Sequence, residues 1–277
     1  MKTILCPVDF SASSFSAIEF ASRLGVRLSA SIELLHVITE KDFDAILSAA
    51  DIDKNLDEKI ELIRAKLGKL EQQIKNDISS ELTVHLTIKE GNLIPLIIET
   101  ENELYIDLIV MGTKGVSNIT EAYFGSNTLQ VIKESTCPVF CIPEGTSIEN
   151  LNRIVYAYNY QPEDIYALKE VITLATNLNA VVDVLHISSE DIKDPAQKDL
   201  EPAQDIKSYF DSPGVNFVYK YFKGPVQEGI NQYLRENKAD ILALLKKKRN
   251  FIEEIFHKSI TQYFAYYTDI PVLVFNY

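Results

Sequence analysis

The residues best suited to chemistry are three glycines and a serine with the spacing Gly-x₂-Gly-x₉-Gly-Ser. Gly112 and Gly115 follow the apolar run 107–111, and Gly125 and Ser126 open a helical pattern. Glycine lets the backbone turn through positive φ and approach a ligand closely. The spacing therefore predicts a loop that binds an anion, most simply a phosphate group.

The start of the following helix strengthens this interpretation. The backbone amides of Ser126, Asn127 and Thr128 would point out of a helix N-terminus, where the helix dipole favours negative charge. Lys114 adds a positive charge to the same loop. The alternative is an ordinary strand-to-helix turn in which Ser126 caps the helix. Three glycines in a chain that holds ten favour the phosphate site.

The elements that must position this loop alternate between strand and helix patterns. This order, βαβαβαβαβ, predicts a five-stranded parallel sheet, doubly wound, with ligands at the carboxyl ends of the strands. Asp9 and the glycine loop both lie at such ends. The expected strands are 2–10, 31–38, 82–89, 107–111 and 137–143; the expected helices are one after the serines at 11–14 that ends near Gly25, one within 40–77, one over 93–103 and one from Ser126.

The second half of the chain repeats the first. An offset of 150 residues places His36 on His186, and an offset of 133 places Asp107 on Asp240. The difference is a deletion of 17 residues within the long helical region of the second copy. A repeat of this length indicates duplicated domains. We expect domains at 1–144 and 151–277, joined by a polar connector.

The second copy has lost the chemistry of the loop. Leu245 replaces Gly112, Lys248 replaces Gly115 and Lys258 replaces Gly125, and only the serine is kept, as Ser259. Asn159 replaces Asp9. Side chains stand where a phosphate would need bare backbone, which predicts a degenerate site. The run 246–249, Lys-Lys-Lys-Arg, is either an alternative anion site or a solvated turn, and we favour the turn.

Composition excludes several classes of function. The 277 residues carry a net charge of -13, which disfavours nucleic acid and anionic membranes as partners. No apolar run is long enough for a membrane span, and no signal-peptide pattern is present, so we expect a cytoplasmic protein. Cys137 and Cys141 could suggest zinc, but buried apolar cysteines are the better interpretation, and we expect no metal site in the protein itself.

No catalytic motif accompanies the glycine loop. His36 and His186 lie in apolar strand runs, where a hydrogen-bonded structural histidine is more common than a general base. The sequence contains no Gly-x-x-x-x-Gly-Lys-Ser/Thr loop and no kinase-type Asp/Asn pair. We therefore name no catalytic residue and leave open whether the protein is an enzyme.

The glycine spacing, together with the N-terminal run Ile-Leu-Cys-Pro-Val-Asp at 4–9, resembles the universal stress protein family. The resemblance covers residues 1 to about 144 well and the rest in outline. It implies a Rossmann-like fold related to the adenine nucleotide alpha hydrolases. It also implies an adenine nucleotide site, formed by Pro7, Val8, Asp9, His36, Val37, Met111, Gly112, Lys114, Gly115, Gly125, Ser126 and Asn127.

The resemblance implies ATP, or AMP or ADP, as the ligand, with Mg²⁺ accompanying the nucleotide. Asp9 would contact the adenine, although it could instead cap the helix that begins nearby. The function expected is a stress-response regulatory module; the alternatives are a slow ATPase or nucleotidyl- or phosphotransferase, or a protein that binds no nucleotide and acts through interaction. Members of the family commonly pair through the last strand of the domain. Here the two copies could pair within one chain, and whole chains could form a homodimer.

Overall fold

The computed structural model describes residues 2–39, 56–113, 126–146, 148, 151–188, 206–210, 212–246 and 270–277. The chain divides into two compact units, Met1–Ile148 and Glu149–Tyr277. Each unit is an α/β domain with its own parallel sheet, as the strand and helix patterns predict.

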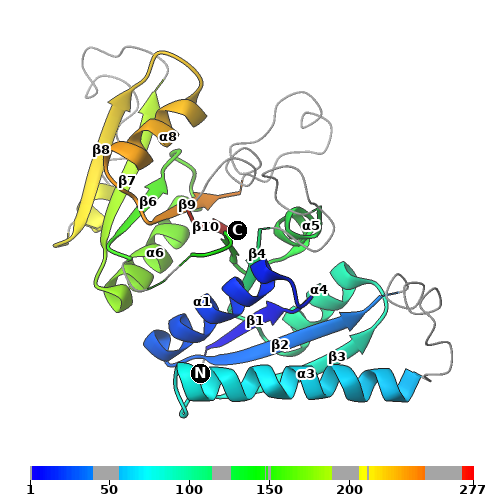
Figure 1. Cartoon of the computed structure of the whole chain (residues 1–277). Coiled ribbons are helices and arrows are strands. Elements are labelled where there is room, and N and C mark those ends of the chain that lie inside the picture. Colours follow the sequence, from blue (N-terminus) through cyan, green and yellow to red (C-terminus); the bar gives the residue numbers. More distant parts are fainter. Residues whose placement is uncertain are drawn as a thin grey trace. The chain divides into compact units, whose positions relative to one another are not determined.

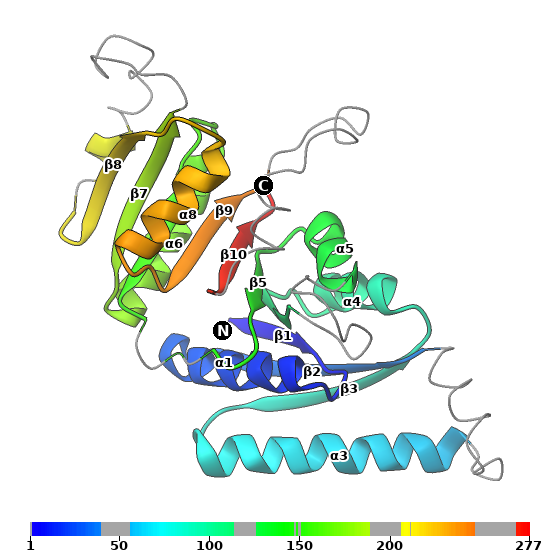
Figure 2. The same ribbon diagram turned by 45° about the horizontal axis from the view of Figure 1, so that its top comes forward.

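The sheet of the first unit has five parallel strands in the order β3-β2-β1-β4-β5. Right-handed crossovers place α1 and α3 on one face and α4 and α5 on the other (Figures 1 and 2). The elements are β1 Thr3–Pro7, α1 Ala12–Leu28, β2 Ser31–Ile38, α3 Leu56–Asp77, β3 Val84–Glu90, α4 Leu93–Glu103, β4 Leu108–Gly112, α5 Ser126–Glu134 and β5 Val139–Ile142.

The second unit repeats this sheet in the order β8-β7-β6-β9-β10, with all strands parallel. The paired elements keep the sequence offsets: β2 and β7 start 150 residues apart, and β4 and β9 start 133 apart. The elements are β6 Arg153–Ala157, α6 Asp164–Leu178, β7 Val181–Ser188, β8 Val215–Tyr221, α8 Val226–Glu236, β9 Ile241–Leu245 and β10 Val272–Phe275.

The sequence suggested that the first helix ends near Gly25, but the structure extends it further. Helix α1 continues to Leu28, and Ser29 closes it in the left-handed conformation with φ 52°. Gly25 instead serves packing, because a Cβ there would lie 3.0 Å from the Ile32 side chain and 3.2 Å from the Ala30 carbonyl oxygen. A glycine near the end of a helix can thus mark a close crossing rather than a stop.

Strand β1 is shorter than the expected 2–10, and the reason bears on the site. The strand ends at Pro7, the Val8 N–H still bonds to the Leu35 carbonyl, and the chain then turns. Phe10 has a φ of 60°, which is rare for a bulky side chain. The three residues between β1 and the N-cap of α1 are therefore a fixed turn at the carboxyl edge of the sheet.

Helix α3 packs on the sheet through one apolar stripe. Leu67, Leu70 and Ile74 are buried, whereas Leu62 is 53% exposed. The helical pattern of the sequence over 56–77 is confirmed, and its N-terminal part, 40–55, lies outside the described residues. Among the described residues, no helix has both the length and the apolar character to span a membrane.

Candidate functional site

The carboxyl end of β1 holds Asp9 in a defined turn. Asp9 Oδ1 accepts the Ser11 N–H at 2.9 Å, and the Asp9 N–H approaches Ser14 Oγ at 3.4 Å. The N-cap of α1 is Ser11, whose Oγ accepts the Ser14 N–H. Asp9 is therefore not the helix cap that the sequence allowed; its carboxylate is exposed and orients the residues that precede the cap.

His36 joins the ends of β1 and β2. Its Nδ1 lies 2.7 Å from the Val8 carbonyl oxygen, so this nitrogen carries the proton that is donated. The imidazole packs against the Phe10 ring with a centroid distance of 5.0 Å. This confirms the structural interpretation of His36, because its ring nitrogen is engaged in holding the backbone turn.

The helix N-termini of α1 and α5 converge on the end of β4. A Cβ on Gly112 would lie 2.6 Å from the carbonyl oxygen of Ser13, in the first turn of α1. From the other side, Thr128 Oγ1 donates to the Gly112 carbonyl at 3.1 Å. Gly112 is therefore required by the close approach of two backbones, which is a packing reason that holds with or without a ligand.

The charge around this junction suits an anion. Neither α1 nor α5 carries an acidic residue in its first turn. Ser126 and Asn127 are exposed at the start of α5, where the first backbone N–H groups have no partner within the helix. Two positive helix ends next to one glycine form a favourable environment for phosphate oxygens.

The structure gathers the described site residues at one edge of the first sheet, at the ends of β1, β2, β4 and the start of α5. Three of them are buried, namely Val8, Val37 and Met111, so a ligand would reach mainly their backbone. Pro7 and His36 are partly exposed. The remaining three predicted residues, Lys114, Gly115 and Gly125, lie outside the described residues.

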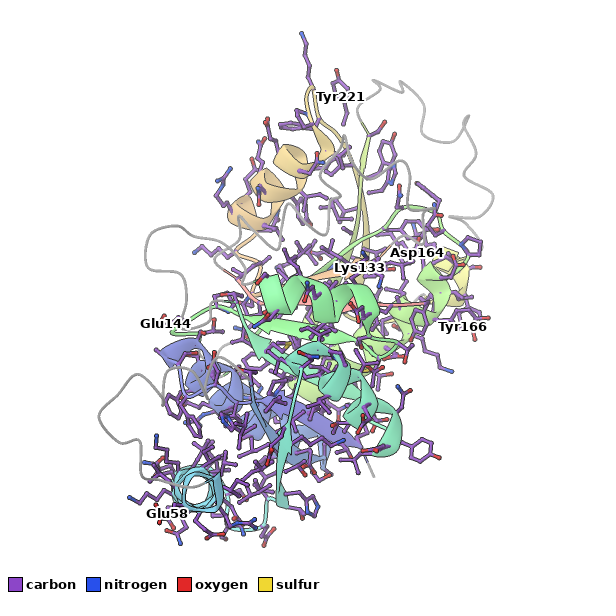
Figure 3. The ribbon with its side chains drawn as sticks, turned by 90° about the vertical axis from the view of Figure 1, so that its right-hand side faces the viewer. Glu58, Lys133, Glu144, Asp164, Tyr166 and Tyr221 are labelled. Atoms are coloured by element: carbon purple, nitrogen blue, oxygen red, sulfur yellow. The ribbon has the colours of Figure 1, made fainter. Side chains whose placement is uncertain are left out.

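In the second unit, a carboxylate occupies the equivalent helix N-terminus. Asp164 stands in the first turn of α6 (Figure 3), at the place of Ser14 in α1, and is buried. It accepts hydrogen bonds from the Tyr156 hydroxyl and from the Gln161 N–H. Burial raises the pKa of Asp164, and these hydrogen bonds oppose that rise. The second unit thus supplies its own carboxyl group to the helix end.

Aromatic rings fill the neighbouring position of the second unit. Tyr158 and Tyr219 stand where the first unit has Val8 and Ile88. Ring centroids lie 4.6 Å apart for Tyr158–Tyr160 and for Tyr160–His186, and 5.4 Å apart for His186–Tyr219.

His186 keeps the clamp of its counterpart, with Nδ1 at 3.0 Å from the Tyr158 carbonyl oxygen. The duplicated turn is therefore preserved, including a left-handed Tyr160 with φ 55°, while its surroundings have changed. Residues 247–249 and Ser259, which the sequence offered as an alternative anion site, lie outside the described residues.

Sequence reasoning did not single out a lysine that contacts the turn after β1. The Nζ of Lys66, from α3, lies 5.3 Å from the centroid of the Phe10 ring. Lys66 is one of many charged positions on an amphipathic helix, and nothing local in the sequence marks it. Only the packing of α3 on the sheet brings it to Phe10, 56 residues earlier in the chain.

The buried environment of the three cysteines makes their thiols unreactive. Cys6, Cys137 and Cys141 are buried and none of them forms a disulfide bond. Burial raises the pKa of Cys137 to about 12 and those of Cys6 and Cys141 further, so all three are thiols at neutral pH. They behave as small apolar core residues.

Known proteins resemble both units. The sequence matches the universal stress protein family over residues 1–143 and again over 150–276. A universal stress protein of Methanocaldococcus jannaschii is 28% identical over 157 residues, which covers 53% of this chain and 97% of that protein.

Solved structures of the same length share the fold. A universal stress protein from Archaeoglobus fulgidus superposes with a TM-score of 0.77 at 19% identity, covering 99% of this chain and 98% of that one. A functionally unknown protein from Pseudomonas aeruginosa gives 0.70 at 13% identity, covering 99% and 92%. The chain therefore belongs to the universal stress protein family and carries two of its domains in tandem.

Proposed function

We propose that the first unit binds an adenine nucleotide, ATP or AMP or ADP, and that the protein is a cytoplasmic stress-response regulator. The observation that carries this proposal is the convergence of two helix N-termini on Gly112. Ser13 of α1 and Thr128 of α5 both contact this residue, and neither helix has an acid in its first turn. Such a junction favours the negative charge of a phosphate chain.

The proposed roles follow the order of the strands. Asp9, His36 and Val37 stand at the ends of β1 and β2 and would face the adenine and ribose. Gly112, with the amides of Ser126 and Asn127, would face the phosphates; Lys114, Gly115 and Gly125 complete the motif.

A bound triphosphate would bring Mg²⁺, which neutralises phosphate charge and is held mostly by phosphate oxygens and water. Asp9 is the nearby carboxylate with a clear place in the site, but we place it toward the adenine and ribose, so the phosphates and water would hold most of the ion. Its Oδ1 is already engaged by the Ser11 N–H, which orients the carboxylate and leaves the rest of it exposed.

Titration calorimetry with ATP and Mg²⁺ tests the proposal. We expect one site per chain, because Asp164 and the tyrosine rings occupy the corresponding place in the second unit. Ser126→Asp places a negative charge at the start of α5 and should weaken ATP binding by about tenfold or more. Ser126→Asn is the control, because asparagine has the size of aspartate without its charge. This variant should bind ATP like the wild type.

Other outcomes decide between the alternatives. Two sites per chain would show that the second unit also binds nucleotide. No binding would favour a protein that works through interaction alone. Release of ADP during prolonged incubation with ATP would favour the slow ATPase; phosphoryl transfer normally needs several positioned metal ligands, and Asp9 is a single carboxylate.

We further propose that the two units pair through their last strands, β5 and β10, and that whole chains form a homodimer. Both strands are short and apolar, Val-Phe-Cys-Ile and Val-Leu-Val-Phe, and such strands pair readily at a sheet edge. Deleting residues 272–277 should separate or unfold the units. Unchanged stability of the shortened chain would contradict the pairing, and light scattering of the full chain tests the dimer.

A further inference from the structure

We propose that Lys66 of α3 contacts the nucleoside part of the bound nucleotide and not its phosphates. The inference rests on the proposed nucleotide site and adds a residue to it. Lys66 lies in none of the motifs that the sequence shares with the family. It comes from the helix within the β2–β3 connection and reaches the turn that follows β1.

The contact that places Lys66 is with an aromatic ring at the site. Its Nζ stands 5.3 Å from the centroid of Phe10, whose ring packs on His36. His36 in turn is bonded to the Val8 carbonyl, next to Asp9. One continuous set of contacts thus links the lysine through two rings to the turn that holds Asp9.

Lys66 differs from other lysines of the first unit in its partners. The chain holds 40 acidic residues against 27 basic ones, so a surface lysine readily finds a carboxylate. On the same unit, Lys75 pairs with Glu71, and Lys89 pairs with both Glu99 and Glu103. Lys66 pairs with no carboxylate in the part of the chain that the structure describes, and its contact there is with the Phe10 ring.

The strand order decides which part of a nucleotide Lys66 would meet. Phe10 and His36 mark the β1–β2 side, whereas Gly112 and α5 lie on the β4 side. Because neighbouring strands are about 4.8 Å apart, the ends of β2 and β4 are separated by roughly 10 Å. A cation on the β2 side therefore faces the base or ribose, and an ammonium over the face of a heteroaromatic ring is a favourable contact.

The second unit offers an internal comparison. The ring equivalent to Phe10 is Tyr160, and among the described residues its ring contacts are with Tyr158 and His186. The connection that contains α3 spans 39–83, whereas the equivalent connection between β7 and β8 spans only 189–214. The longer connection therefore occurs in the unit that keeps the glycine loop, and it brings a cation to the site.

The test measures AMP and ATP binding by calorimetry for the wild type and four variants of the full chain. Lys66→Ala removes the contact, Lys66→Met keeps the aliphatic stem without the charge, and Lys66→Arg keeps the charge. Lys69→Ala is the matched control, an exposed lysine on the same helix three residues away. Thermal unfolding without ligand verifies that all variants fold.

Loss of a cation–ring contact should weaken binding about threefold to tenfold in Lys66→Ala and Lys66→Met. The factor should be the same for AMP and ATP, and Lys66→Arg and Lys69→Ala should bind like the wild type. A loss that grows from AMP to ATP would place Lys66 at the phosphates and overturn the proposal. Equal binding by Lys66→Ala and Lys69→Ala would also overturn it. Failure of the wild type to bind either nucleotide would refute the nucleotide site itself, a result distinct from these two.

Discussion

Gly112, at the end of β4, lies directly against the carbonyl oxygen of Ser13 in the first turn of α1, so that a Cβ on Gly112 would be 2.6 Å from that oxygen. A methyl carbon and a carbonyl oxygen cannot approach this closely, so a side chain at position 112 would displace the backbone. The glycine that the sequence marks as a phosphate contact is thus also a packing residue. Loss of nucleotide binding in a Gly112 variant would not by itself separate the two roles.

This relationship predicts a stability loss without any ligand. Gly112→Ala should lower the free energy of unfolding by about 1–3 kcal/mol, because the methyl group must push apart α1 and β4. Chemical denaturation of the ligand-free protein measures this loss. The matched control is Gly68→Ala, in α3, where a Cβ meets nothing within 4 Å. That change should stabilise the helix by about 0.5–1 kcal/mol, and equal stability of the two variants would contradict the packing role of Gly112.

We expect the carboxylate of Asp164 to disfavour phosphate in the second unit, and the same carboxylate can be introduced into the first unit. Ser14→Asp would place the same charge at the N-terminus of α1. At an effective dielectric constant near 20, repulsion at about 8 Å is roughly 2 kcal/mol, enough to weaken ATP binding more than tenfold.

Ser14→Asn is the control for this transfer, because it has the size of aspartate without its charge. Calorimetry with ATP compares the two variants. If both lose affinity equally, steric change rather than charge would be responsible, and the explanation of the second unit would be wrong.

The hydrogen bond from Tyr156 to Asp164 should stabilise the second unit. Both residues are buried, and the hydroxyl offsets the burial that raises the pKa of Asp164. Tyr156→Phe should lower the free energy of unfolding by about 1.5–3 kcal/mol, the usual value for a hydrogen bond to a charged group. Thermal or urea unfolding at neutral pH measures the effect.

The pH dependence of this effect has a definite sign. The deficit of Tyr156→Phe should shrink as the pH falls through the pKa of Asp164, which burial raises above its ordinary value. The carboxyl group then becomes protonated in the folded protein and has less need of a donor. The control is Tyr166→Phe. Tyr166 lies on the same helix as Asp164 and is 61% exposed, so this change should alter stability by less than about 0.5 kcal/mol. A deficit that grows on acidification would contradict the assignment.

His186 predicts a loss of stability on mild acidification. Burial lowers its pKa, while the hydrogen bond to the Tyr158 carbonyl opposes this. The unfolded chain therefore binds the proton at higher pH than the folded one, so stability should fall as the pH drops through about 6.5. His186→Asn, whose amide can donate the same hydrogen bond, should reduce this decline. The other three histidines remain unchanged, so an identical pH profile for both proteins would refute the prediction.

Much of the fold could be read from the chain itself. Strand β2 and helix α4 have the bounds that their patterns predicted, because each has a clear apolar period and clear ends. The duplication was visible from His186 and Asp240, and the structure gives Asp107 and Asp240 the same task, accepting backbone N–H groups at the start of β1 and β6. The glycine spacing pointed to the edge of the sheet at which we propose the nucleotide site.

The sequence by itself indicated the family, through the resemblance of its glycine spacing and of residues 4–9. It also determined the parallel α/β architecture and the residues at the ends of β1 and β4, because local periodicity and turn chemistry act over short stretches. Tertiary structure alone decided what those residues contact. It showed that the Ser13 backbone leaves no room for a side chain at position 112, that Ser11 rather than Asp9 caps α1, and that Lys66 reaches Phe10. These contacts join segments that lie far apart or that offer several equivalent caps, and only the packing of helices on the sheet selects among them.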